Sequence, residues 1–131
     1  MSVAVVVSDS PEGREALVRA VEEARLRGGE LIACAVSDAG TITEDDSAAT
    51  RFAVEQILHS RGVENAPFQL CLEPDGGDPA GAIVDLVGAL DCDLLVIGSR
   101  RRSAVGKLLL GSVATRVILD SPVPVLVVKA A

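Results

Sequence analysis

The sequence predicts an α/β domain in which a parallel β-sheet is covered by helices. Short runs rich in β-branched and other aliphatic residues alternate with helical patterns along all 131 residues. The first run, VAVVV at 3–7, is apolar throughout, as is typical of a strand buried on both faces. Parallel neighbours need crossover connections, which the intervening helices supply. We expect five strands and four helices in a single domain over residues 1–131.

The first helix has a clear start signal directly after the first strand. Ser10 is a typical cap residue, Pro11 suits the first turn, and Glu12 is an early acidic residue. The apolar residues that follow recur at helical spacing. Gly28 ends the pattern, and LIACAV at 31–36 is the second predicted strand.

The middle of the chain continues the alternation. A helix is expected over 47–61, with FQLCL at 68–72 as the third strand and Asp78–Pro79 opening the third helix. We interpret the carboxylates at 44–46 as a loop and a helix start rather than as a metal site, because no further ligand is spaced to join them. The expected core contacts of the second helix are Phe52, Ile57 and Leu58.

The last third contains the fourth strand, LLVIG at 94–98, and a glycine-punctuated stretch that leads to Gly111–Ser112. A final helix follows, and VPVLVV at 123–128 is the fifth strand. Open parallel sheets bind ligands at the carboxyl ends of their strands, where the strand order reverses. The residues just after the first and fourth strands are therefore the place to look for a site.

Composition argues against several classes of partner. The net charge of −7 disfavours nucleic acid and anionic membrane, and the absence of Trp and Tyr leaves no platform for stacking bases. Three cysteines without a CxxC pair suggest buried thiols in a reducing compartment. The apolar run at 3–7 is too short for a signal-peptide core. We expect a cytoplasmic protein.

The segment after the fourth strand is basic, although the chain as a whole is acidic. A helix starting near Ser112 offers unpaired N–H groups to an anion, so the pattern fits a phosphate site or, equally, a solvated basic loop with a helix cap. The P-loop spacing around Gly106 is absent. Four cations fall within eight residues, at Arg100, Arg101, Arg102 and Lys107.

Hydrolytic machinery is not apparent from the residues. Asp9, directly after the first strand, could accept hydrogen bonds from a ribose or help to hold a metal, but it could also simply cap the first helix. His59 is the only histidine, and we expect it on the surface of a helix. No nucleophile elbow is present. We therefore expect no catalytic residues, no metal ligands and no enzyme, although weak hydrolysis of a phosphate-bearing ligand stays open.

Several motifs together resemble the universal stress protein family. The family pattern G-x2-G-x9-G-[S/T] is met at Gly98, Gly111 and Ser112, with Arg101 in place of the second glycine. Gly77–Asp78–Pro79 before the third helix, Asp9 after the first strand and the closing PVPVLVVK also resemble that family. The resemblance covers essentially the whole chain.

This resemblance implies a flavodoxin-like, doubly wound sheet of order 3-2-1-4-5 that binds ATP, with or without Mg²⁺, between strands one and four. It implies a stress-response role and a homodimer through Val123–Val128. The alternative is a dimeric interaction module that binds no nucleotide. Arg101 could either strain the loop or hold phosphate. The implied ligand residues are Val7, Val36 and Ile97 for adenine, Asp9 for ribose, and Gly98, Gly111, Ser112 and Val113 for the phosphates.

Overall fold

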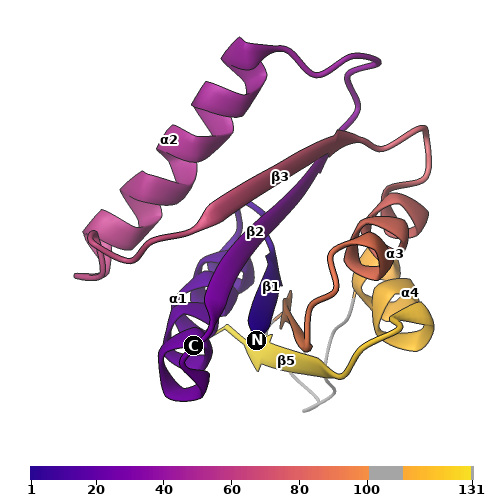
Figure 1. Cartoon of the computed structure of the whole chain (residues 1–131). Helices are drawn as coiled ribbons and strands as arrows, with labels where there is room; N and C mark the ends of the chain where they lie inside the picture. Colours follow the sequence, from indigo (N-terminus) through magenta and orange to yellow (C-terminus); the bar gives the residue numbers. More distant parts are fainter. Residues whose placement is uncertain (101–110, 131) are drawn as a thin grey trace.

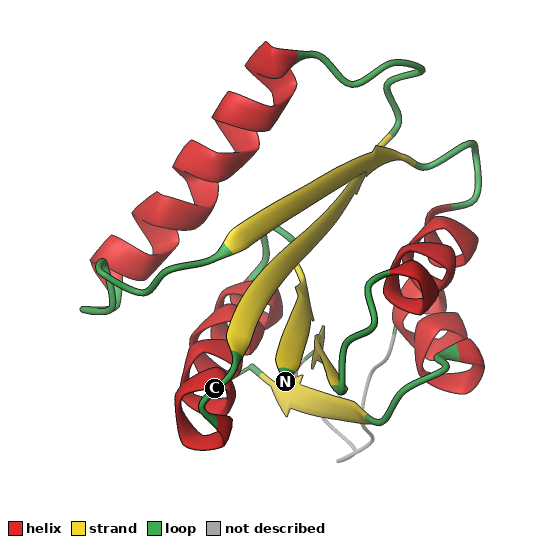
Figure 2. Ribbon diagram, in the orientation of Figure 1, coloured by secondary structure: helices red, strands yellow, loops and turns green. Residues whose placement is uncertain are grey.

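The computed structural model describes residues 1–100 and 111–130, and its centre is a five-stranded parallel sheet of order β3-β2-β1-β4-β5 (Figure 1). This confirms both the predicted fold class and the order 3-2-1-4-5. Strands and helices alternate along the chain (Figure 2). The elements are β1 (Ser2–Val6), α1 (Pro11–Arg27), β2 (Glu30–Ser37), α2 (Glu44–Ser60), β3 (Gln69–Pro74), α3 (Pro79–Ala89), β4 (Leu94–Ser99), α4 (Ser112–Asp120) and β5 (Val125–Lys129).

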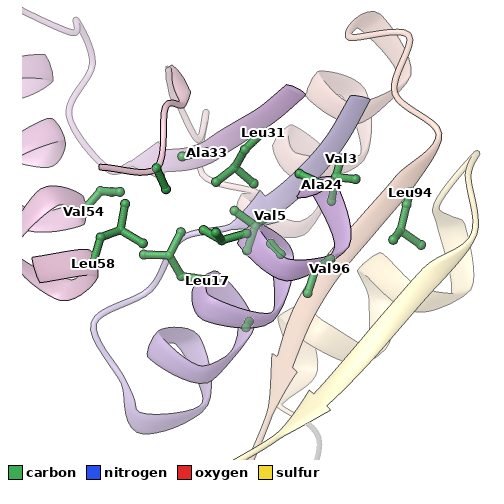
Figure 3. Close-up of a cluster of buried hydrophobic side chains, with 14 residues drawn as sticks. Val3, Val5, Leu17, Ala24, Leu31, Ala33, Val54, Leu58, Leu94 and Val96 are labelled. Atoms are coloured by element: carbon green, nitrogen blue, oxygen red, sulfur yellow. The ribbon is translucent and has the colours of Figure 1, made fainter. Parts of the chain in front are cut away.

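The central position of β1 explains its continuous apolar run. Successive side chains of a strand point to opposite faces of the sheet. Val3 and Val5 pack with residues of α1 and α2 in one cluster, drawn in Figure 3, whereas Ala4 packs with residues of α3 and α4 in a second cluster. The three residues are fully buried. The helices therefore cover the sheet in two pairs, one pair on each face.

The second helix differs from its prediction at two points. It begins at Glu44 rather than near residue 47, because Thr43 and Asp46 form a capping box in which each side chain accepts a hydrogen bond from the other residue's backbone N–H. Phe52 was expected in the core but is 63% exposed, which is a wrong prediction. Leu58 is buried as expected, and Val54 supplies the other buried contact of this helix.

The fifth strand begins at Val125 instead of residue 123. Ser121 accounts for the shift, since its hydroxyl contacts both the carbonyl oxygen and the N–H of Val123 and holds that residue in a turn. Pro124 then precedes the strand, and its carbonyl accepts from the N–H of Leu95 at 2.9 Å. In the described part of the chain, the strand pairs with β4 along one side only.

Within the described residues, no helix combines the length and the hydropathy needed to cross a lipid bilayer.

Candidate functional site

The carboxyl ends of β1 and β4 lie side by side, as the strand order requires. These strands pair in register from Val3 with Leu94 to Val5 with Val96. The chain leaves β1 toward α1 and leaves β4 at Ser99, so Asp9 and Arg100 both follow strands that end at this edge. This edge is the point at which the strand order reverses, where open α/β sheets bind their ligands.

The turn from β1 into α1 is held by a set of short hydrogen bonds. The N–H of Val7 donates to the carbonyl of Cys34 at 2.8 Å, which extends the pairing of β1 with β2 beyond Val6. Ser10 caps α1, because its Oγ accepts from the N–H of Gly13 at 3.0 Å. The Oγ atoms of Ser8 and Ser10 are 2.9 Å apart. A side chain at Gly13 would collide with Ser8, so this tight turn needs a glycine there.

Asp9 is not the helix cap, since Ser10 takes that role. Its carboxylate is 98% exposed and pairs with the guanidinium of Arg14, one turn into α1, at 3.2 Å. An exposed ion pair of this kind contributes little to stability. The carboxylate of Asp9 is therefore free to exchange its partner for a ligand hydroxyl. Arg14 was not singled out from the sequence, although the spacing of five residues from Asp9 could have indicated it.

The amino end of α4 is the second component of the site. Gly111 is its N-cap and supplies no side-chain hydrogen bond to the first turn. The guanidinium of Arg100 approaches from the end of β4, with Nη2 at 3.7 Å from the position that a Cβ of Gly111 would occupy. A helix amino end carries a partial positive charge, so this arrangement places a cation beside another positive group. An anion between them would relieve that repulsion.

The remaining predicted residues lie on different faces of this edge. Val36 and Ile97 pack in the cluster formed with α3 and α4, whereas Val7 packs in the cluster formed with α1 and α2. Ser112 and Val113 are exposed in the first turn of α4. Arg101 lies outside the described residues.

A polar hollow adjoins Val36 at the carboxyl end of β2. Its volume is about 420 Å³. Its wall combines the end of β2 with the first turns of α2, and the residues that contribute polar groups are Ser37, Asp38, Asp46 and Thr50. These residues were not predicted as part of a site, and the apolar run of β2 gave no signal for them.

The model of the universal stress protein family matches residues 1–129. The chain belongs to this family. A universal stress protein of Mycolicibacterium smegmatis is 39% identical over 129 residues, which cover 97% of this chain and 96% of that protein. The structure of a universal stress protein from Archaeoglobus fulgidus superimposes with a TM-score of 0.77 at 34% identity, covering 98% of each chain. A second, from the same organism and in complex with dAMP, has a TM-score of 0.72 at 28% identity, also with 98% of each chain covered.

In this universal stress protein, the first glycine of the family pattern has a packing role. A Cβ on Gly98 would collide with the backbone of Glu12 in the first turn of α1. The absence of a side chain therefore lets α1 start close against β4, which brings the amino end of α1 beside the candidate site. Glycine at this position is required by the fold, whether or not a ligand also approaches it.

Proposed function

We propose that this universal stress protein binds an adenine nucleotide, ATP in the first instance, at the carboxyl edge between β1 and β4. Binding would serve as a regulatory signal in a stress response. The observation that carries the proposal is the guanidinium of Arg100 beside the amino end of α4 at Gly111, which has no side-chain cap. Phosphate groups suit this position because they satisfy both positive groups at once.

Further support comes from the adjoining residues. Asp9 has an exposed carboxylate at the end of β1, where ribose hydroxyls could donate to it. Val36 is half-buried and offers some apolar surface on one face of the sheet edge, and the buried Ile97 packs in the same cluster. The dAMP complex of the A. fulgidus relative is consistent with an adenine nucleotide as the ligand class. With ATP, Mg²⁺ would lower the charge that the phosphates bring to this acidic chain.

The direct test is mass analysis of small molecules released from freshly purified, denatured protein. Co-purified ATP or AMP supports the proposal. Calorimetric titration then gives the affinity of the stripped protein for ATP and for AMP. Protein that carries no nucleotide and binds neither compound would favour the alternative, an interaction module without a nucleotide.

A variant pair tests the phosphate contact. Arg100→Gln should weaken ATP binding about tenfold at low ionic strength, the effect of losing one charge-assisted hydrogen bond, and the difference should shrink as salt rises. Arg19→Gln removes an exposed charge from α1, where Arg19 pairs with Glu22, and should leave the affinity unchanged. Equal losses in both variants would contradict a specific contact.

We propose that the protein binds the nucleotide without significant turnover. We also propose a cytoplasmic location, in which the three cysteines stay as free thiols. His59, the only histidine, is exposed in the last turn of α2. Turnover of Mg-ATP is expected far below the range of about 1–10³ s⁻¹ that is typical of enzymes. Steady hydrolysis near this range, abolished by one substitution, would contradict this part of the proposal.

A further inference from the structure

A pocket of about 330 Å³ opens at the amino-terminal edge of the sheet, the edge opposite to the proposed nucleotide site. Its walls come from the end of α1, the start of β2 and the segment that leads into β3. Each of these residues lies in the described part of the chain. The volume falls at the lower end of the range for small-molecule sites, about 300–1,000 Å³, so a ligand for this pocket must be small.

The floor of the pocket is apolar and belongs to the main core cluster. Val21 and Ala24 of α1 meet Leu31 of β2 and Ala66 there, and each of these four residues is at most 8% exposed. Figure 3 shows Ala24 and Leu31 as part of this cluster. Two of the four are alanines, whose short side chains leave the space. The ring of Phe68 forms a further wall, and the guanidinium of Arg51 lies over it, 5.0 Å from the centroid.

The rim of the pocket carries both signs of charge. The exposed residues Arg25 and Glu30 both line the pocket, and the carboxylate of Glu30 accepts a hydrogen bond from Nε2 of Gln69 at 3.3 Å. The two opposite charges do not pair with each other, and in the described part of the chain Arg25 forms no ion pair. The pocket thus combines an apolar floor with one cation and one anion at its mouth.

We propose that this pocket binds a small zwitterion with an apolar side chain, the chemistry of an aliphatic or aromatic α-amino acid. The ligand's carboxylate would meet Arg25, its ammonium would meet Glu30, and its side chain would cover Ala24 and Ala66. A simple anion would be repelled by Glu30, and a simple cation by Arg25, so the pair of charges selects a ligand that carries both. Because both charges are exposed, each contact is weak, and the expected dissociation constant is about a millimolar.

The test is a titration of the isotope-labelled full chain with L-leucine, followed by amide chemical shifts. Saturating shifts confined to residues 21–31 and 66–69 are expected. Leucinamide lacks the carboxylate and N-acetyl-leucine lacks the ammonium, so each should bind about three- to fivefold more weakly. Glycine lacks the side chain and should give no saturation. The absence of saturating shifts with leucine, or equal binding of leucinamide, would overturn the proposal.

Variants then assign the charges. Arg25→Gln should weaken leucine binding about three- to fivefold and abolish the preference of leucine over leucinamide. Arg19→Gln, on the same helix but outside the pocket, is the matched control and should change neither. Ala24→Leu should fill the floor of the pocket and abolish leucine binding. Because this substitution of a buried residue also affects the stability of the fold, the result for Arg25→Gln decides whether the assignment holds. Arg25→Gln with unchanged leucine affinity would overturn the assignment.

The test of this pocket can succeed or fail independently of the test of nucleotide binding. Leucine shifts that persist in the presence of saturating ATP are expected, because the two sites lie at opposite edges of the sheet. Protein that binds leucine but no nucleotide would contradict the proposed function and leave the pocket assigned. Displacement of leucine from residues 21–31 by ATP would overturn the pocket as a separate site.

Discussion

Arg116 on α4 forms a two-pronged ion pair with Asp78, the residue that caps α3. Nη1 of Arg116 donates to Oδ1 of Asp78 at 2.6 Å and Nη2 donates to Oδ2 at 3.1 Å, while the N–H of Gly81 donates to Oδ1 at 3.2 Å. The guanidinium of Arg116, and after it the backbone N–H of Gly81, hold the pKa of the Asp78 carboxyl below its ordinary value of 3.8. One carboxylate thus joins two helices on the same face of the sheet.

Asp78→Asn should lower the midpoint of thermal unfolding slightly at pH 7, because asparagine still caps a helix but does not pair with Arg116 as a charge. Since the folded pKa of Asp78 is lowered, its contribution is fully present above pH 3.8 and is lost as the pH falls through the lowered value. The difference between the two proteins should therefore vanish in strong acid. Thermal unfolding followed by circular dichroism from pH 7 to pH 2 measures it. Asp78→Ala should lower the midpoint further, because the cap is lost as well, and a difference that grows in acid would contradict this account.

Gly98→Ala should destabilise the protein by about 1–3 kcal/mol, the usual cost of adding a methyl group to a packed site. The added Cβ meets the backbone of Glu12, which cannot move without shifting the start of α1. Gly88→Ala is the matched control, because the nearest atom to its added Cβ is Cγ of Pro122 at 3.9 Å. Alanine there should leave the stability unchanged or raise it. Urea unfolding of both variants measures the effect, and equal stabilities would contradict the packing role of Gly98.

The three thiols should differ in reactivity. Burial raises the pKa of Cys34 to about 12, with smaller contributions from the neighbouring Cys71 and Cys92. Burial also raises the pKa of Cys71, although that residue is only half-buried. The reactive thiolate is therefore disfavoured, most of all at Cys34. Brief alkylation at pH 8 with mass detection should label Cys71 first and Cys34 only after denaturation. Rapid labelling of Cys34 in the native protein would contradict its burial.

Elements with strong local signals were predictable from the sequence, and contacts between distant segments were not. The apolar run at 3–7 and the cap at Ser10 both lie within a few residues. The structure confirms the cap and a first strand, which spans Ser2–Val6 and so begins and ends one residue earlier than predicted. The pairing of Asp78 with Arg116 spans 38 residues and depends on how two helices pack, so neither residue alone indicates it. Phe52 illustrates the opposite error, because hydrophobicity suggested burial but its position on α2 faces outward.

In the candidate site, too, features set by neighbouring residues were predictable and contacts between distant segments were not. Asp9 was identified because it follows the first strand and Gly111 because it precedes the last helix, whereas the ligand role of Gly98 was implied only by the family resemblance. The collision that requires glycine at position 98 involves Glu12, which is far from it in the sequence, and the guanidinium of Arg100 approaches Gly111 although eleven positions separate the two residues, so neither contact follows from the sequence. The residues implied for adenine lie in two core clusters, because Val7 packs on the face covered by α1 and α2, whereas Val36 and Ile97 pack on the face covered by α3 and α4. The alternation within one strand does not fix which face it shares with residues of another strand, so the sequence alone did not indicate this distribution.

We expect a two-fold homodimer formed through the free edge of β5, within the segment Val123–Val128. Among residues 1–100 and 111–130 this strand pairs only with β4, and an unpaired edge rich in β-branched residues associates readily unless it is covered. Light scattering should give about twice 13.5 kDa.

Because the N–H of Leu95 donates to the carbonyl of Pro124, the alternation of a parallel ladder directs the N–H of Val127 away from β4. Val127→Pro should therefore remove a donor from the free edge without breaking the pairing with β4, and should yield a folded monomer. Leu119→Gln, an exposed change on α4, is the control and should remain dimeric. A wild-type chain that is monomeric at tens of micromolar, or a Val127→Pro variant that is folded and still dimeric, would show that β5 is not the interface.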